Sequence, residues 1–304
     1  MPPESRRPGP SGVDGWFVLT LRRENAPVLP HPVTGAPFAS PVPPGTGWPT
    51  DRATDRTPVA RSRDDVHRLA ASAPDLAELD ARVSVCRACP RLVAWREEVA
   101  VAKRRAYADQ PYWGRPVTGW GDERPWLLVV GLAPAVHGGN RTGRVFTGDR
   151  SGDWIFAALH RAGLATRATS EQAGDGQQLL GARIAAAVRC APPGNRPEPG
   201  ERDSCAPWLD REVTLVAPTL RAVLALGAFA WDATFGCLRR LGWGVPARRP
   251  VFGHGAQVAV RQPVGVAVQV FASYHVSQQN TFTGRLTQGM LDDVLGTVRR
   301  CRGS

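Results

Sequence analysis

The chain has 304 residues with a formal net charge of +11, and 42% of its residues are hydrophobic. This composition supports one large or two modest domains with a real core, which excludes a chain that is disordered throughout. No apolar run approaches the roughly 18 residues of a membrane-spanning helix, and no secretory segment stands at the N-terminus, so we expect a cytoplasmic protein. The strongly basic balance favours nucleic acid as a partner.

Residues 1–80 differ in composition from the rest of the chain. Thirteen of the 28 prolines lie before Val59. Such segments bury too little apolar surface to fold, so we expect a largely disordered extension, whether a real tail or the result of a misplaced translation start. This segment contains nine arginines and ten acidic residues, so the excess positive charge lies in the expected folded domain, residues 81–304.

From residue 81 onward, apolar runs alternate with amphipathic segments. Four apolar runs have the length of buried parallel strands, at 126–130, 184–188, 222–226 and 266–272. Helices are expected at 153–162, 211–220 and 286–300. The pattern predicts an α/β fold, a three-layer α/β/α sandwich with a central, mainly parallel four-stranded sheet. Ligands of such sheets bind at the carboxyl ends of the strands, where this chain has unusual loops.

Four of the six cysteines are candidate metal ligands. Cys86 and Cys89 form a Cys-x2-Cys pair at the start of an expected helix, and Cys190 and Cys205 follow downstream. A cytoplasmic chain does not favour disulfides, and four thiolates can hold zinc or an iron-sulfur cluster. Spacing does not choose between these, and ordinary buried cysteines are the simpler alternative.

The first unusual loop spans residues 131–149 and reads GLAPAVHGGNRTGRVFTGD. Its glycines allow close backbone approach to a ligand, Arg141 and Arg144 can meet phosphates, and Phe146 offers a stacking face. Phe146 can equally be a core residue. Asp149 would bring a carboxylate to the pocket, although it can also be the N-cap of the next helix.

Two further loops carry polar side chains. The second, residues 189–198, combines Cys190 with Asn195, whose amide can read the edge of a base or serve only in a turn. The third, residues 274–283, carries His275, which can stabilise a developing anion or be a satisfied histidine at a strand end.

Together these motifs resemble the type 5 uracil-DNA glycosylases, iron-sulfur enzymes of the uracil-DNA glycosylase superfamily. The resemblance covers about residues 81–300 and includes the segment YWGRPVTGWGD at 112–122, the Cys-x2-Cys pair and the three loops. It implies a 4Fe-4S cluster, regarded as structural in this family, held by Cys86, Cys89, Cys190 and Cys205.

The resemblance also implies hydrolysis of the N-glycosidic bond of uracil in DNA, and of other deaminated bases such as hypoxanthine, to initiate base excision repair. Asp149 and His275 are then catalytic, because the sugar becomes positive and the departing base negative. The implied substrate-binding residues are Gly131, Ala133, Ala135, His137, Asn140, Phe146 and Asn195. We expect a monomer that flips the damaged base out of the DNA duplex.

One residue departs from the family pattern. The third loop usually reads His-Pro-Ser, whereas this chain has His275-Val276-Ser277. Without the proline ring we expect a more mobile loop and reduced or altered activity. Two alternatives remain open: a degenerate glycosylase that binds damage without excising it, and a non-catalytic nucleic-acid-binding protein in which the four cysteines hold a metal.

Overall fold

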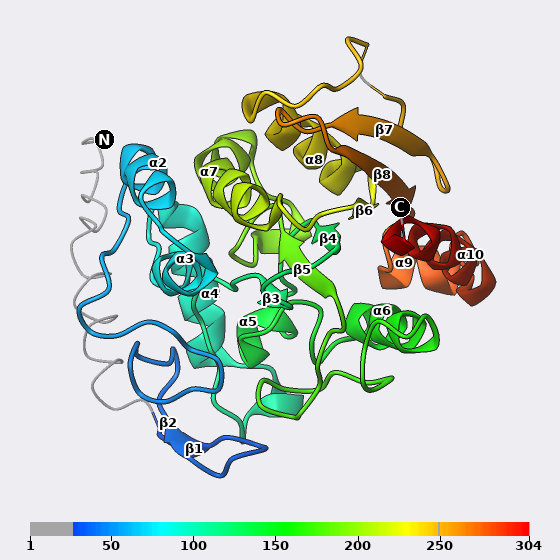
Figure 1. The fold of residues 1–304 in the computed structure, drawn as a ribbon. Helices are drawn as coiled ribbons and strands as arrows, with labels where there is room; N and C mark the ends of the chain where they lie inside the picture. The colour runs from blue at the N-terminus through cyan, green and yellow to red at the C-terminus, as the bar shows by residue number, and fades with distance from the viewer. Residues whose placement is uncertain (1–26, 249, 304) are drawn as a thin grey trace, which may run out of the picture.

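The computed structural model describes residues 27–248 and 250–303, and its centre is a six-stranded sheet (Figure 1). The strand order is β3-β5-β4-β6-β8-β7. The four inner strands are parallel and in register with their neighbours, as predicted: β5 (Ala182–Ala186), β4 (Leu127–Gly131), β6 (Ala222–Leu226) and β8 (Ala267–Ser273).

The prediction of four strands missed both edges of the sheet. β3 (Trp120–Gly121) pairs antiparallel with β5, and β7 (Gln257–Arg261) pairs antiparallel with β8. β3 has only two residues, and β7 is mostly exposed with a single buried residue, Val260. Neither segment therefore has the continuous apolar run by which the inner strands were identified.

Helices cover both faces of the sheet, because side chains alternate along each strand. Leu127 and Val129 of β4 pack into one core with α6 (Arg150–Arg161) and α10 (Gln288–Arg299). Leu128 and Val130 pack into the opposite core. The helices of that second face are α2 (Arg63–Ala71), α3 (Leu76–Ser84), α7 (Pro199–Val216) and α8 (Ala228–Arg240). The predicted three-layer α/β/α arrangement is confirmed.

The helix ends follow ordinary capping rules. Ser62, Asp75 and Thr287 cap α2, α3 and α10 through their side chains. α4 (Pro90–Ala102) begins directly after Cys89, with proline at its first position. The remaining short elements are β1 (Leu29–Pro30), β2 (Pro37–Phe38), η1 (Arg105–Tyr107), α5 (Gly139–Thr142), η2 (Pro193–Asn195), α9 (Gln278–Phe282) and η3 (Arg300–Gly303).

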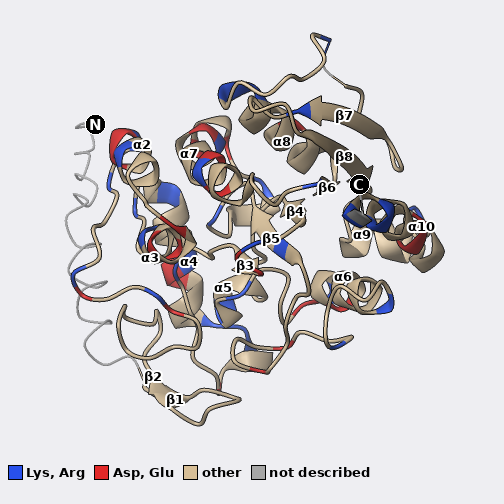
Figure 2. Ribbon diagram, in the orientation of Figure 1, with Lys and Arg blue, Asp and Glu red and all other residues tan. Residues whose placement is uncertain are grey.

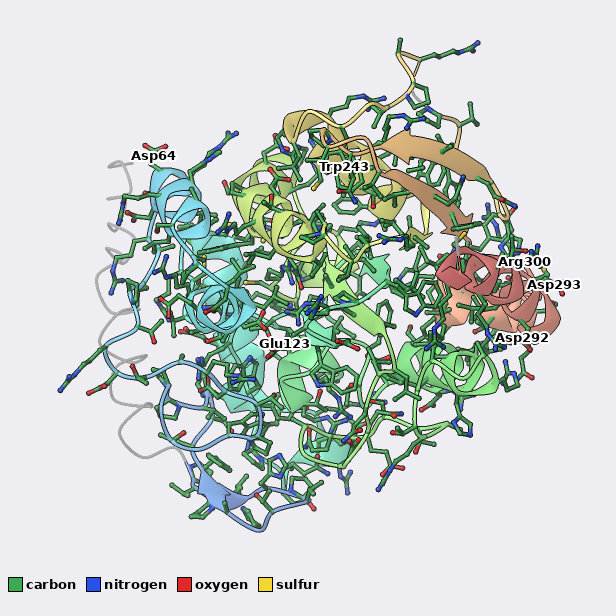
Figure 3. The ribbon with its side chains drawn as sticks, in the orientation of Figure 1. Asp64, Glu123, Trp243, Asp292, Asp293 and Arg300 are labelled. Carbon is green, nitrogen blue, oxygen red and sulfur yellow. The ribbon has the colours of Figure 1, made fainter. Side chains whose placement is uncertain are left out.

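The two helices of the first face are also joined at their surfaces. Asp292 lies on α10 at the edge of the molecule, and Arg161 of α6 binds its carboxylate at 2.8 Å (Figure 3). No helix in the described part of the chain is both long and apolar enough to cross a bilayer.

The structure differs from the expected disordered extension over residues 27–80. Within them, residues 27–60, here called the strap, run along the segment at 112–117 (Figure 1). Trp48 is 3% exposed and its ring lies 5.9 Å from that of Trp113. Residue 80 falls inside α3, so no domain boundary lies there. The prediction concerning residues 1–26 lies outside the described residues.

Candidate active site

The parallel strands bring the predicted loops to one edge of the sheet. β5, β4, β6 and β8 are neighbours in this order and point the same way, so their carboxyl ends meet at that edge. The second loop follows β5, the first follows β4, and the third follows β8. Gly227 directly follows β6, the strand between β4 and β8, and sequence reasoning did not single it out.

Phe146 and His275 lie together although they come from different loops. Their ring centroids are 6.0 Å apart. A Cβ atom at Gly131 would lie 2.8 Å from the Phe146 ring, and one at Gly227 would lie 3.1 Å from Cβ of His275. Glycines at the ends of β4 and β6 therefore allow both rings to approach the strand ends closely.

Asp149 is the N-cap of α6, one of its two predicted roles, and its catalytic role stays a prediction. Its Oδ1 accepts the backbone N–H of Gly152 at 2.9 Å and so caps α6. Its Oδ2 lies against Gly138, where an added Cβ would be only 1.8 Å away. Burial raises the pKa of Asp149, while the backbone hydrogen bonds from Gly152 and Ser151 oppose this shift.

Burial favours the neutral form of the His275 imidazole. Burial lowers the pKa of His275 to about 4. The Asn280 amide donates to the His275 carbonyl at 2.8 Å, and the side chain of Val276 is fully buried in the core beside α10. These contacts hold the third loop where the family's proline is missing, and the expected greater mobility stays a prediction.

Two candidate base-binding residues have left-handed backbone conformations. Phe146 has φ 49° and Asn195 has φ 56°. Non-glycine residues in this region are strained, and such strain is concentrated at functional sites. Asn195 ends η2, is exposed, and makes no side-chain hydrogen bond within the described residues. The structure thus brings Phe146 to His275, whereas Asn195 lies on the surface of its loop.

The remaining candidates in the first loop have structural partners. His137 Nδ1 lies 3.1 Å from the hydroxyl of Tyr112. Asn140 is 1% exposed and its amide donates to the carbonyl of Arg96 at 3.1 Å. Ala133 and Ala135 are half-buried, and the Ala135 carbonyl accepts the backbone N–H of Asn140. These residues shape the loop from within.

The expectation that Arg141 and Arg144 meet phosphates is wrong. Their exposed fractions are 5% and 2%. Arg144 pairs with Asp175 at 2.5 Å. Arg141 donates to the carbonyls of His137 and Gly148 at 2.8 Å and so ties the first loop together. These contacts take up the hydrogen-bonding capacity of both guanidinium groups inside the protein.

The four predicted cysteine ligands line one cavity. Cys86 and Cys89 stand between α3 and α4, Cys190 follows β5, and Cys205 lies in α7. Burial, together with the neighbouring Cys190, raises the pKa of Cys86 to about 11 and that of Cys89 to about 12. Such thiols become thiolates when a cation takes up their charge.

Buried hydrogen-bond donors without partners surround the same cavity. Within the described residues these are Nε of Arg96, Nε and Nη1 of Arg189, and Nε1 of Trp208. Buried donors need an acceptor, and a group with thiolate or sulfide sulfur supplies acceptors there. Sequence reasoning missed all three residues, because a lone Arg or Trp in an apolar helix or loop carries no distinguishing pattern.

A buried ion-pair network extends from this cavity along the second face of the sheet. Arg189 pairs with Glu212 of α7, Glu212 pairs with Arg183 of β5 at 2.5 Å, and Arg183 pairs with Asp80 of α3 at 2.9 Å. Arg183 and Glu212 are 2% and 0% exposed. The network anchors the start of the second loop to helices of the second face.

A family model described as the uracil DNA glycosylase superfamily matches residues 118–298. Similar proteins that carry the name type-5 uracil-DNA glycosylase include those of Mycobacterium tuberculosis, Thermus thermophilus and Pyrobaculum aerophilum. That of Mycobacterium tuberculosis is 56% identical over 273 residues, 90% of this chain and 99% of the relative. Those of Thermus thermophilus and Pyrobaculum aerophilum are each 46% identical, covering 73% and 70% of this chain and 95% and 88% of the relatives.

Proposed function

Since the chain belongs to the type-5 uracil-DNA glycosylases of the uracil-DNA glycosylase superfamily, we propose that Asp149 and His275 stabilise the two charges of glycosidic-bond cleavage. The activity is that of a uracil-DNA glycosylase in base excision repair, a hydrolase acting on N-glycosyl bonds. Cleavage builds positive charge on the sugar and negative charge on the base. The site therefore needs an anion at the first and hydrogen-bond donors at the second.

Asp149 supplies the anion. The bond from Gly152 fixes Oδ1, so the carboxylate has one orientation, and Oδ2 faces Gly138 in the first loop. We assign Oδ2 to the developing positive charge of the sugar and to the orientation of the attacking water. The low polarity that raises the pKa of Asp149 also strengthens its interaction with a cationic sugar.

His275 supplies a donor for the departing base. A neutral imidazole keeps one N–H, and a neutral donor stabilises a developing anion without having to lose a proton. Phe146, whose ring lies 6.0 Å from that of His275, stacks on the flipped base. Asn195 reads the polar edge of the base, for which its exposed and otherwise unbonded amide is suited.

A single observation carries this assignment. The first and third loops are far apart in the sequence, yet Phe146 and His275 meet at the carboxyl edge of the sheet. Asp149 lies three residues after Phe146, at the start of α6. Stacking face, donor and carboxylate therefore share one edge of an α/β sheet, where such folds bind their ligands.

The test is excision of uracil from a labelled duplex with one uracil, followed by alkaline cleavage of the abasic site. Asp149→Ala is expected to lose about two to three orders of magnitude in rate, the effect typical of removing one group that stabilises transition-state charge. Binding to abasic-site DNA is expected to survive. Full excision by Asp149→Ala would remove the assignment.

We propose further that Cys86, Cys89, Cys190 and Cys205 hold a 4Fe-4S cluster. The unpaired donors around the cavity suit a group with acceptor sulfur, and four thiolates are the usual ligand set of such a cluster. When bound, the cluster supplies structural cross-linking of α4, the second loop and α7. Excision at the strand ends then proceeds on side chains outside the cavity.

The spacing of the thiols favours the cluster over zinc. Four thiolates around one zinc ion, each about 2.3 Å from it, lie about 3.8 Å apart. Within the described residues, no three His, Cys, Asp or Glu side chains are grouped closely enough to hold a single metal ion. Thiolates of a four-iron cluster bind separate irons and stand farther apart. Iron and sulfide content and brown absorption near about 400 nm test this, whereas a colourless zinc protein would refute it.

DNA carrying a deaminated base is the proposed partner, with hypoxanthine as a second substrate. Uracil and hypoxanthine both present a carbonyl and an N–H, which an amide such as that of Asn195 can complement. Excision of both bases, with both rates reduced in Asn195→Ala, would support this reading. Hypoxanthine left intact by an enzyme that is active on uracil would restrict the substrate to uracil.

A further inference from the structure

Arg96 of α4 lies between the four-cysteine cavity and the first loop. It is 1% exposed. Its Nη1 donates to Sγ of Cys190 at 2.8 Å, and its Nη2 donates to the carbonyl of Cys86 at 3.1 Å. The guanidinium thus contacts Cys86, from the pair that precedes α4, and Cys190, from the second loop.

The charge of Arg96 has no carboxylate of its own. Within the described residues, the one carboxylate in ion-pair range is that of Glu97 at 4.0 Å, and it already forms two bonds with Arg87. A buried cation without an anionic partner is strongly destabilising. Arg96 donates to Sγ of Cys190. The negative charge that Arg96 needs would therefore be supplied by the Cys190 thiolate, as part of an anionic bound group.

The backbone of Arg96 makes the second connection. Its carbonyl accepts the side-chain amide of Asn140 at 3.1 Å. The backbone N–H of Asn140 donates to Ala135 at 3.1 Å, and its carbonyl accepts from Gly114 at 2.9 Å. These bonds fix the part of the first loop that contains Gly138, against which the Asp149 carboxylate lies.

We propose that Arg96 is a positioning residue that couples the four-cysteine site to the catalytic loop, its guanidinium tuning the bound cluster and its carbonyl holding Asn140. This inference rests on the cluster proposed above. Positive charge and N–H donors at a ligand sulfur favour the more negative, reduced cluster, so loss of the guanidinium lowers the reduction potential. Loss of the Asn140 amide disturbs the loop and leaves the potential unchanged.

The experiment compares Arg96→Gln and Asn140→Ala in the full-length, anaerobically purified protein. Arg82→Gln is the matched control, because Arg82 is a mostly buried arginine paired with Glu78 and does not line the cavity. For Arg96→Gln we expect the oxidised-to-reduced ratio at a fixed potential to rise about tenfold, a shift of about 59 mV for one electron. Iron is also expected to be lost faster to a chelator.

For Asn140→Ala we expect an unchanged potential, with kcat reduced about tenfold and KM little altered, because Asp149 is displaced while DNA binding persists. A wild-type kcat in this variant would overturn the connection to the loop. A potential in Arg96→Gln equal to that of Arg82→Gln would overturn the tuning while leaving the cluster proposal intact.

Two further outcomes are decisive. Wild-type protein without iron and sulfide would refute the cluster proposal itself. If Arg96→Gln purifies without iron, Arg96→Lys, which keeps the positive charge, decides the matter. Restored iron content in Arg96→Lys supports the charge argument, and iron that is equally absent overturns it.

Discussion

Each of the three proposed reacting or stacking side chains lies against a glycine. Phe146 packs on Gly131, and His275 packs on Gly227. The closest approach is that of Asp149 to Gly138, where an added Cβ would overlap the carboxylate. These glycines carry no chemistry, but they determine how near the functional groups can come to the ends of the strands.

Gly138→Ala is therefore expected to act like an active-site mutation. The new Cβ would lie 1.8 Å from Oδ2 of Asp149, so the carboxylate must move, and a displacement of about 1 Å can cost about 100-fold in rate. Single-turnover excision measures the effect. Gly289→Ala in α10 is the control, because nothing lies within 4 Å of its new Cβ. Equal rates for the two variants would contradict this view of the loop.

The ionisation of the two catalytic candidates predicts a one-sided pH profile. Burial raises the pKa of Asp149 and lowers that of His275 to about 4. The proposed reaction needs Asp149 ionised and His275 neutral, and both conditions hold above both pKa values. We expect kcat/KM to rise through an acidic limb above the usual Asp value of about 3.9 and then stay level through neutral pH.

A pH series of kcat/KM, with folding checked by circular dichroism at each point, measures this profile. Asp149→Glu is expected to move the acidic limb. A loss of activity between about pH 6 and pH 8 that disappears in His275→Gln would show that His275 acts as the imidazolium instead.

The strap is the element that differs most from the sequence-based prediction, which expected a disordered extension. Ser40 accepts the N–H of Tyr112 at 2.8 Å, and Asp51 binds Arg115 at 2.7 Å. Tyr112 and Arg115 belong to the segment at 112–117, which also contacts the first loop. There the backbone N–H of Trp113 donates to the carbonyl of Arg141 at 3.0 Å. The strap thus supports the catalytic loop through one intervening segment.

Trp48→Ala is expected to reduce the free energy of unfolding by about 3–5 kcal/mol, the usual cost of removing a buried indole. Trp48 contacts Trp113, and its Nε1 would lie 2.7 Å from a Cβ at Gly143 of the first loop. Chemical denaturation measures the change. Arg52→Ala, in the same strap and more than half exposed, should change stability by less than about 0.5 kcal/mol. A neutral Trp48→Ala would mean that the strap is not part of the core.

The elements show which predictions a sequence can support. The inner strands, α6 and α10 follow from apolar runs and periodicity. The catalytic roles of Asp149 and His275, which the family resemblance implies, stay predictions. The strap could not be identified in this way, because it contacts residues more than 60 positions away, as Trp48 does with Trp113 and Asp51 with Arg115. The burial of Arg144 could not be predicted either, because its partner Asp175 lies in another loop.

The positive charge of the whole molecule is distributed among many elements. Figure 2 shows Lys and Arg on α2, α6, α10 and the loop after α8, without concentration on a single element. Several arginines are buried in ion pairs and are therefore not available to DNA. The total of 38 lysines and arginines thus overstates the number of side chains that can contact phosphates.

Arg150 is the arginine that we expect to bind a phosphate. Its side chain is 60% exposed, it follows Asp149 directly, and its guanidinium lies 5.8 Å from the Phe282 ring of the third-loop helix α9. For Arg150→Ala, the slope of log Kd against log salt should fall by about 0.9, the effect of one lost phosphate contact. Arg161→Ala, at the other end of α6 and paired with Asp292, should leave the slope unchanged. Equal slopes for both variants would place the DNA elsewhere.

The position of the strap has a practical consequence for recombinant work. The family model starts at residue 118, and a protein trimmed near that point would lose Trp48, Asp51 and the paired cysteines. It would also lose Trp113, whose backbone N–H donates to the carbonyl of Arg141 in the first loop, and Arg115, which binds Asp51. Such a fragment would be prone to aggregate and should not be taken as the minimal enzyme. Truncations and fusion joints are better placed ahead of residue 27.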